Sequence, residues 1–226
     1  MNRAAIALAL IAVAQAGRPV RADRDEVQAQ EPSGDILQRE GRLREAERAY
    51  RDALSKVRKL RGEGDPRVAD AVIDLASNLE AQGKARAVED LYRLEIDVSR
   101  KNADPGNTRV LSTAFAEWLL KSRRPADAEL LARGALDLGL RSLQPGDWRL
   151  GNAKSVIGAT LVAQKRFAQA EPLLLEAQKG LASATDAPED IRQNAIRRLV
   201  DLYEAWEHAS PGQGKMAEAA RWKARR

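Results

Sequence analysis

The chain has 226 residues, of which 31% are charged and only 4% are aromatic, and its 38 basic and 33 acidic side chains give a formal net charge of +5. The lack of cysteine excludes disulfides, thiol catalysis, cysteine-ligated metals and the lipid-bearing cysteine of a bacterial lipoprotein. Because basic residues are dispersed among acidic ones, the charge favours solubility and does not predict nucleic-acid binding.

The first sixteen residues have the pattern of an export signal. Arg3 is followed by an uncharged apolar run, Ala4–Ala14, and Ala14 and Ala16 are small residues placed as signal peptidase requires. The run is too short to cross roughly 30 Å of hydrocarbon as a helix. We therefore predict a signal peptide over residues 1–16, cleavage after Ala16, and an exported protein, periplasmic or secreted, without stable membrane insertion. A buried N-terminal helix, or a membrane tether if cleavage fails, is the alternative.

A polar lead over residues 17–31 precedes a repeat with a period of about 42 residues. The first anchor of each copy begins with a bulky apolar residue. The next residue is small in three of the copies, and a second apolar residue follows four positions after the bulky one. The anchor begins at Leu75, Phe115, Ile157 and Leu199, with a degenerate copy at Ser33. The predicted solenoid, residues 32–226, thus divides into units at about 32–63, 64–103, 104–144, 145–186 and 187–226.

A second anchor opens a second apolar block in each unit. It lies at Ala46, Val88, Ala128, Ala170 and, after an insertion within residues 208–213, at Ala219. In both blocks apolar residues recur at the spacing of a helix that is buried on one face. The repeat therefore predicts an all-α fold, a right-handed α–α superhelix of about five helix–turn–helix units.

The residues between the two blocks predict the turns. The fifth position before the second anchor is glycine at Gly41, Gly83 and Gly214, and glycine ends a helix easily in the left-handed conformation. Arg123 and Lys165 occupy this place in the third and fourth units, so we expect strain in those two turns. Asp65 before Pro66 predicts a capped helix start in the second unit.

Small residues recur where the two helices of a unit would cross. A bulky side chain there would push the helix axes beyond a contact of roughly 8–10 Å. We therefore assign these positions to the core and not to a binding site; they are Ala46, Ala76, Ala116, Ala128, Gly158 and Ala170.

Two segments carry a resemblance to a known family: residues 83–92, with Gly-Lys before the second anchor, and residues 164–174, which read QKRFAQAEPLL. They resemble tetratricopeptide repeats (TPR). The period exceeds the usual 34 residues and is similar to that of kinesin light chains. Residues 199–206 and 217–222 resemble the repeat arm of bacterial serine/threonine kinases, although the chain has no kinase motif. The resemblance implies a solenoid that binds proteins and is not an enzyme.

In this family the first helix of each pair lines a concave face, so the resemblance implies a groove lined by side chains that the core does not use. We expect a partner peptide or helix in this groove, with its basic part near Asp70 and Asp74; a merely solvated charged face is the alternative. The candidate partner-binding residues are Asp70, Ile73, Asp74, Ser77, Glu80, Thr113, Glu117, Lys121, Asn152, Ser155, Asn194, Arg197, Arg198 and Asp201.

One binding mode of the family is not expected here. Members with a carboxylate clamp use lysine and asparagine in the groove, and the matching positions of the second unit hold Ile73 and Ser77. Trp148, at a unit start, is a further candidate for a partner contact, since tryptophan is enriched in binding hot spots.

The residues offer no catalytic or cofactor site. The single histidine, His208, lies in the insertion without a second residue to share a metal or complete a triad. We interpret carboxylates such as Glu89 and Asp97 as solvated helix surface. No enzyme activity, cofactor, metal or nucleic-acid partner is therefore predicted.

These observations predict an exported scaffold or adaptor whose ligand is a protein or peptide. A self-associating assembly module and a cytoplasmic or membrane-tethered regulatory repeat protein are the alternatives. The oligomeric state and the identity of the partner stay open.

Overall fold

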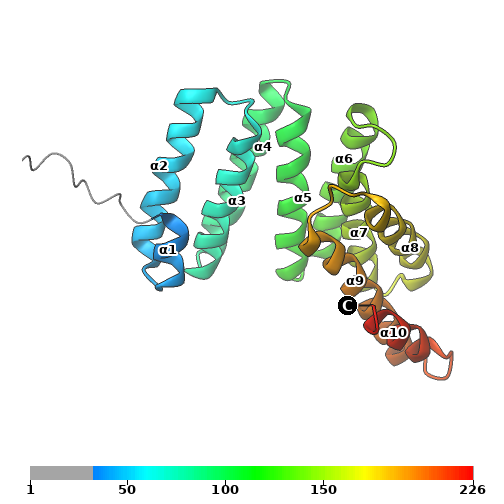
Figure 1. Ribbon diagram of the computed structural model, residues 1–226. Coiled ribbons are helices and arrows are strands. Elements are labelled where there is room, and N and C mark those ends of the chain that lie inside the picture. Colours follow the sequence, from blue (N-terminus) through cyan, green and yellow to red (C-terminus); the bar gives the residue numbers. More distant parts are fainter. Residues whose placement is uncertain (1–32, 226) are drawn as a thin grey trace, which may run out of the picture. The chain divides into compact units, whose positions relative to one another are not determined.

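The computed structural model describes residues 33–225, and within this range all regular secondary structure is helical. Consecutive helices pack against each other along the whole order (Figure 1), which confirms the predicted TPR-like solenoid. The predicted signal peptide and the whole polar lead lie outside the described residues. The helices are α1 (Gly34–Arg39), α2 (Leu43–Arg61), α3 (Pro66–Ala81), α4 (Ala85–Lys101), α5 (Pro105–Lys121), α6 (Pro125–Ser142), α7 (Trp148–Ala163), α8 (Phe167–Ser183), α9 (Glu189–Ala209) and α10 (Lys215–Lys223).

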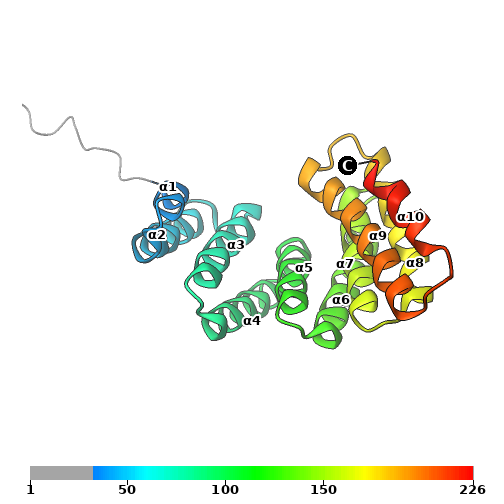
Figure 2. The ribbon, with the colours of Figure 1, turned by 90° about the horizontal axis from the view of Figure 1, so that it is seen from below.

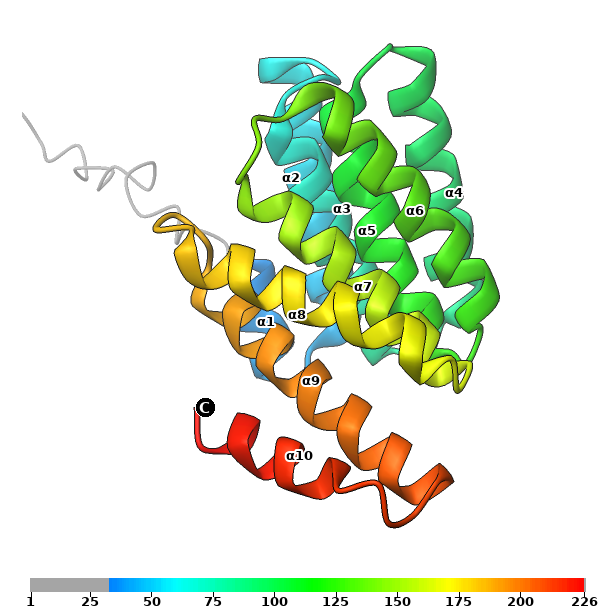
Figure 3. The ribbon, with the colours of Figure 1, turned by 90° about the vertical axis from the view of Figure 1, so that its right-hand side faces the viewer.

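The helices form two layers. The first helices of successive pairs, α3, α5, α7 and α9, contact one another in series. Figure 2 shows α3, α5 and α7 on the inner side of a curve, with α4, α6 and α8 on its outer side. Figure 3 shows the last pair, α9 and α10, beyond α7 and α8. Among residues 33–225 no helix has the length and apolar character that a membrane crossing requires.

Aspartates start three of the inner helices. The side chain of Asp65, as predicted, accepts a hydrogen bond from the Arg67 backbone N–H at 3.0 Å. Asp104 and Asp147 cap α5 and α7 in the same way, at 3.0 Å and 2.9 Å. Each cap satisfies a backbone donor that the first turn of a helix leaves free, so the starts of the inner helices are fixed locally.

The turns within the pairs take the left-handed conformation. Gly41, Gly83 and Gly214 have φ values of 75°, 72° and 72°. Arg123 and Lys165 both have φ of 60°, which confirms the strain expected in the third and fourth units. A side chain is unfavourable in this region because its Cβ approaches the following carbonyl oxygen.

The small residues at the helix crossings lie in the core, as predicted. The five alanines are at most 1% exposed. The sixth residue, Gly158, lies too close to α8 to carry a side chain. A Cβ on Gly158 would lie 2.5 Å from Cγ of Leu174. Stacked aromatic rings fill the space between units; Tyr92 and Phe115 have ring centroids 5.2 Å apart.

A ladder of ion pairs joins successive units on the outer layer. The acid that follows the second anchor pairs with a basic residue at the start of the next unit's second helix. Glu89, interpreted above as solvated surface, is such a residue, because it pairs with Arg124 of the next unit. The pairs are Glu47–Lys84 (2.7 Å), Glu89–Arg124 (2.7 Å), Glu129–Arg166 (2.8 Å) and Glu171–Lys215 (3.4 Å).

Candidate functional site

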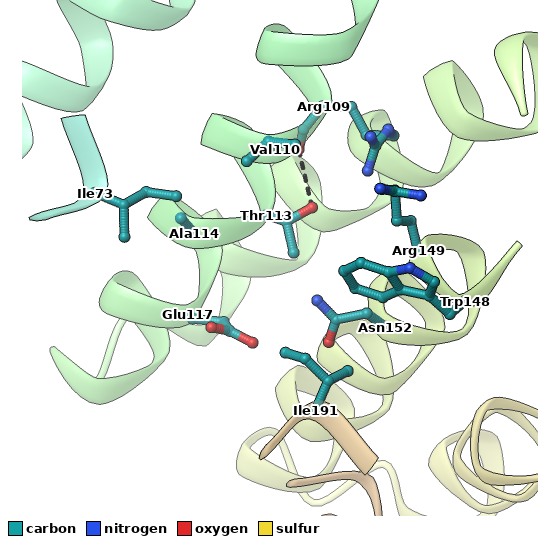
Figure 4. Close-up of a pocket in the computed structure, with 10 residues that line it drawn as sticks. All are labelled: Ile73, Arg109, Val110, Thr113, Ala114, Glu117, Trp148, Arg149, Asn152 and Ile191. Carbon is teal, nitrogen blue, oxygen red and sulfur yellow. Dashed lines mark hydrogen bonds between the residues drawn. The ribbon is translucent and has the colours of Figure 1, made fainter. Parts of the chain in front are cut away.

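Two adjoining hollows lie along the inner layer, with volumes of about 240 Å³ and about 170 Å³. We call the larger one the Trp148 hollow (Figure 4) and the smaller one the Lys121 hollow. The Trp148 hollow is lined by Ile73, Arg109, Val110, Thr113, Ala114, Glu117, Trp148, Arg149, Asn152 and Ile191. The Lys121 hollow is lined by Ile73, Ala76, Ser77, Glu80, Tyr92, Ala114, Glu117, Trp118 and Lys121.

The hollows bring together half of the residues predicted for the groove. Ile73 and Glu117 line both of them, so the two spaces form one continuous surface over α3 and α5. Within the Lys121 hollow, Lys121 and Glu80 form an ion pair at 3.6 Å. The predicted residues found in the hollows are Ile73, Ser77, Glu80, Thr113, Glu117, Lys121 and Asn152.

The two predicted aspartates of α3 do not line either hollow. Asp70 and Asp74 are exposed. Local desolvation, together with the negative charges of Asp35 and Asp70, raises the pKa of Asp74 above its ordinary value. Asp35 in turn accepts a hydrogen bond from the Tyr50 hydroxyl at 2.7 Å. This end of the inner face is therefore acidic, as the sequence indicates.

The α9 residues of the predicted set do not line either hollow. Asn194 is half-buried, and Arg197 and Asp201 are exposed. Arg198 is folded inward: Nη2 donates to Glu117 at 2.7 Å, and Nη1 donates to the Ser155 hydroxyl at 3.0 Å. It therefore acts as a connection between helices.

The structure corrects two of the predicted placements. Ser155 is fully buried, because α9 packs on α7 there and Arg198 covers the serine hydroxyl. Thr113 borders the Trp148 hollow but is largely buried, and its hydroxyl donates to the Arg109 carbonyl at 2.9 Å. Neither hydroxyl is free for a partner, since each already has a hydrogen bond within the chain.

The sequence analysis missed the two arginines of the Trp148 hollow. Arg109 lies in the second turn of α5 and, by helical spacing, has a position on the packed side of the helix. Arg149 lies in the first turn of α7, before the apolar block. The two arginines do not occupy matching repeat positions, because the residue 42 positions after Arg109 is Gly151, so the repeat pattern carries no signal for the pair. Trp148, suggested as a partner contact, is half-buried and lies in the hollow.

Arg109 has an unusual environment. It is only 8% exposed, and its Nε is buried without a hydrogen-bond partner among residues 33–225. Burial lowers the pKa of its guanidinium below the ordinary value, and the positive charge of Arg149 acts in the same direction while Asp147 opposes it. Arginine stays charged despite such shifts, so the hollow holds a buried positive charge.

The guanidinium of Arg149, unlike Nε of Arg109, has interaction partners within the chain. It lies 4.6 Å from the centroid of the Trp148 ring, and it pairs with Asp147 at 3.3 Å. The opposite wall of the hollow is apolar, with Ile73, Val110 and Ala114 on α3 and α5. The site can thus accept an apolar group and a charged one side by side.

The described part of the chain shows no arrangement for metal chemistry. No group of three or more His, Asp or Glu residues that could hold a metal ion occurs within residues 33–225. His208 lies exposed near the end of α9.

Comparison with known proteins agrees with this geometry. The tetratricopeptide repeat family model matches residues 25–101. No curated protein matches the chain significantly.

Among solved structures, BtubC (BKLC) from P. vanneervenii superposes with a TM-score of 0.67 at 20% identity, over 84% of this chain and 77% of that one. A Podosopora anserina chain of nearly identical TPR-like repeats, described as a kinesin light chain, superposes with a TM-score of 0.60 at 14% identity, over 85% of this chain and 92% of that one. Residues 25–101 therefore match the tetratricopeptide repeat family, and the chain shares the fold of these TPR-like solenoids over the superposed range.

Proposed function

We propose that the chain is an exported scaffold that binds a segment of a partner protein, as an extended peptide or a helix, along the inner face of α3, α5, α7 and α9. The observation that carries this proposal is the pair of adjoining hollows on that face. TPR folds serve as protein–protein interaction modules in general, and a hollowed inner layer is the surface by which such solenoids bind.

Apolar contact supplies the affinity in this proposal. Ile73, Val110, Trp148 and Ile191 are half-buried in the chain by itself and still border open space in the Trp148 hollow. A partner side chain seated there would remove this remaining apolar surface from water, which is the dominant favourable contribution in most protein association. Tryptophan at the centre of a contact is typical of a binding hot spot.

Charge sets the orientation of the partner. The exposed Asp70 and Asp74 form an acidic end on α3 next to the hollows, and we place the basic part of the bound segment there. Electrostatic complementarity of this kind changes the association rate and the direction of binding more than the affinity.

Export is supported by the composition of residues 1–16 and by the lack of cysteine in the chain. N-terminal sequencing of the protein purified from its native cell tests this part, and the expected first residue is Gly17. An N-terminus that begins at Met1 would contradict export and favour the regulatory alternative.

The groove is tested by affinity capture of a partner from the envelope fraction, followed by binding measurements with the identified partner. Ile73→Glu, which alters both hollows, should abolish binding, and the double reversal Asp70→Lys with Asp74→Lys should slow association. The matched controls lie on the outer layer: Leu130→Glu, whose residue is 75% exposed, and the double reversal Asp90→Lys with Asp97→Lys on α4. Equal loss in the controls, or unchanged binding in Ile73→Glu, would contradict the proposal.

A further inference from the structure

The Trp148 hollow contains two guanidinium groups for which the proposed function has no role. Arg109 belongs to α5 and Arg149 to the start of α7, and Figure 4 shows their guanidinium groups next to each other on one side of the hollow. Arg109 is more than nine-tenths buried, and its Nε has no acceptor within residues 33–225. A buried donor without a partner is rare in folded proteins. Two adjacent positive charges and a free donor together indicate that an acceptor of negative charge belongs here.

The carboxylates near this site are already engaged. Asp147 accepts from the Arg149 backbone N–H at 2.9 Å and pairs with the Arg149 guanidinium. Glu117, on the opposite side of the hollow in Figure 4, is held by Arg198 at 2.7 Å. Neither of them reaches Nε of Arg109. The chain therefore does not neutralise Arg109 from its own described residues.

We propose that the Trp148 hollow is a carboxylate-binding site, which holds an acidic group of the partner between Arg109 and Arg149 with an apolar neighbour against Trp148 and Ile73. This inference rests on the proposed function, because the carboxylate belongs to the segment bound along the inner face. It differs from the lysine–asparagine clamp of other TPR proteins, since it uses arginines at the starts of α5 and α7.

The geometry of arginine favours a carboxylate. The planar guanidinium presents parallel N–H donors that match the two oxygens of a carboxylate, and such charge-assisted hydrogen bonds are stronger than neutral ones. Partial burial keeps water away and strengthens these interactions.

The size and walls of the hollow define the rest of the ligand. A volume of about 240 Å³ is below that of sites for drug-sized molecules, so it accepts one or two side chains. Ile73, Val110 and Ile191 provide apolar contacts elsewhere in the same hollow. With Asp70 and Asp74 at the other end of the face, the bound segment has a basic end over α3 and an acidic and apolar part at α5 and α7.

Three small probes test the carboxylate with the full chain. They are N-acetyl-leucyl-glutamate amide, with a side-chain carboxylate; N-acetyl-leucyl-leucine, with a terminal carboxylate; and the neutral N-acetyl-leucyl-glutamine amide. Binding is followed by the shift of the Trp148 indole N–H in NMR spectra. At least one acidic probe should bind about tenfold more tightly than the neutral one, and the better acidic probe tells which carboxylate source the site prefers. Equal binding of all three would overturn the proposal.

Variants assign the effect to the arginines. Arg109→Met keeps the buried stem of the side chain and should remove most of the preference for the acidic probe. Arg149→Met is the second variant, at a half-buried position where a loss of folding is less of a risk. Arg86→Met, at a side chain that is 96% exposed on α4, is the matched control and should leave binding unchanged. A preference that persists in both hollow variants would overturn the proposal.

The same variants separate this inference from the proposed function. One outcome is that Ile73→Glu abolishes binding of the captured partner while Arg109→Met and Arg149→Met leave that binding unchanged. In that case the groove is the binding surface and the carboxylate-site proposal is wrong. If Ile73→Glu has no effect on the partner, the proposed function itself fails.

Discussion

Arg198 and Glu117 are 81 residues apart in the chain, and their side chains meet at 2.7 Å across the inner layer. Arg198 belongs to α9 and Glu117 to α5, and the same guanidinium also donates to Ser155 on α7. The pair therefore joins three units, whereas the other contacts of a solenoid connect neighbours. Because the Arg198 side chain is only 15% exposed, solvent screens this pair less than a surface ion pair.

Arg198→Met should lower the free energy of unfolding by about 1–3 kcal/mol, because it leaves Glu117 and Ser155 without their partner. A double-mutant cycle with Glu117→Gln, followed by urea denaturation, should give a coupling of at least about 0.5 kcal/mol. Arg197→Met, at the exposed neighbour, should change stability by less than about 0.5 kcal/mol. Additive effects of the two mutations would show that the contact does not stabilise the fold.

Acid should weaken the ladder between the first two units. The pKa of Glu47 is lowered from 4.5 to about 2, chiefly by the hydrogen bond from Lys84 and further by Gln82 and Arg51. Since the folded-state pKa is depressed, this stabilisation is present above pH 4.5 and is lost as the pH falls toward 2. Glu47→Gln should therefore be less stable than the native chain at pH 7 and show a shallower loss of stability over that window.

Thermal unfolding between pH 7 and pH 2 measures this difference. Asp52→Asn, at an exposed side chain of α2 that makes no ion pair among residues 33–225, provides the control, and its pH profile should be parallel to that of the native chain. Parallel profiles for Glu47→Gln as well would contradict the linkage.

The close approach of α7 and α8 should make Gly158 intolerant of any side chain. In Gly158→Ala the new Cβ would lie 2.5 Å from Leu174, which is itself fully buried, so the helices must separate at a cost of about 1–3 kcal/mol. Gly134→Ala on α6 has open space around the new methyl group and should instead stabilise the chain by about 0.5–1 kcal/mol. Urea denaturation distinguishes the two signs, and stabilisation by both substitutions would refute the packing argument.

The two left-handed turns without glycine should be sites of easy stabilisation. Arg123→Gly or Lys165→Gly removes a Cβ at φ of 60° and should raise the free energy of unfolding by up to about 1 kcal/mol. The reverse change, Gly83→Arg at φ of 72°, should lower it by a similar amount, although nothing lies within 4 Å of the new Cβ. Melting temperatures of the three variants provide the test, and shifts of the same sign in all of them would contradict it.

The sequence by itself determined the helix pairs, their turns and their core. Asp65, which caps a helix, and Arg123, which replaces glycine in a turn, act through neighbours within about one turn of helix. Gly158 acts through a helix contact that the repeat places at a constant spacing. Such features appear as a periodic pattern in one sequence because every unit has to meet the same local requirements.

Only the tertiary structure decided which side chains are available at the inner face. Ser155 has the helical position of a groove residue but is covered by Arg198 from another unit, and Arg109 has a core position but borders the hollow without a partner for its Nε. Both outcomes depend on how neighbouring units pack together. The pattern within a single helix cannot specify which groove side chains are buried or paired. Side chains that reach across from another unit decide this, and helical periodicity does not describe them.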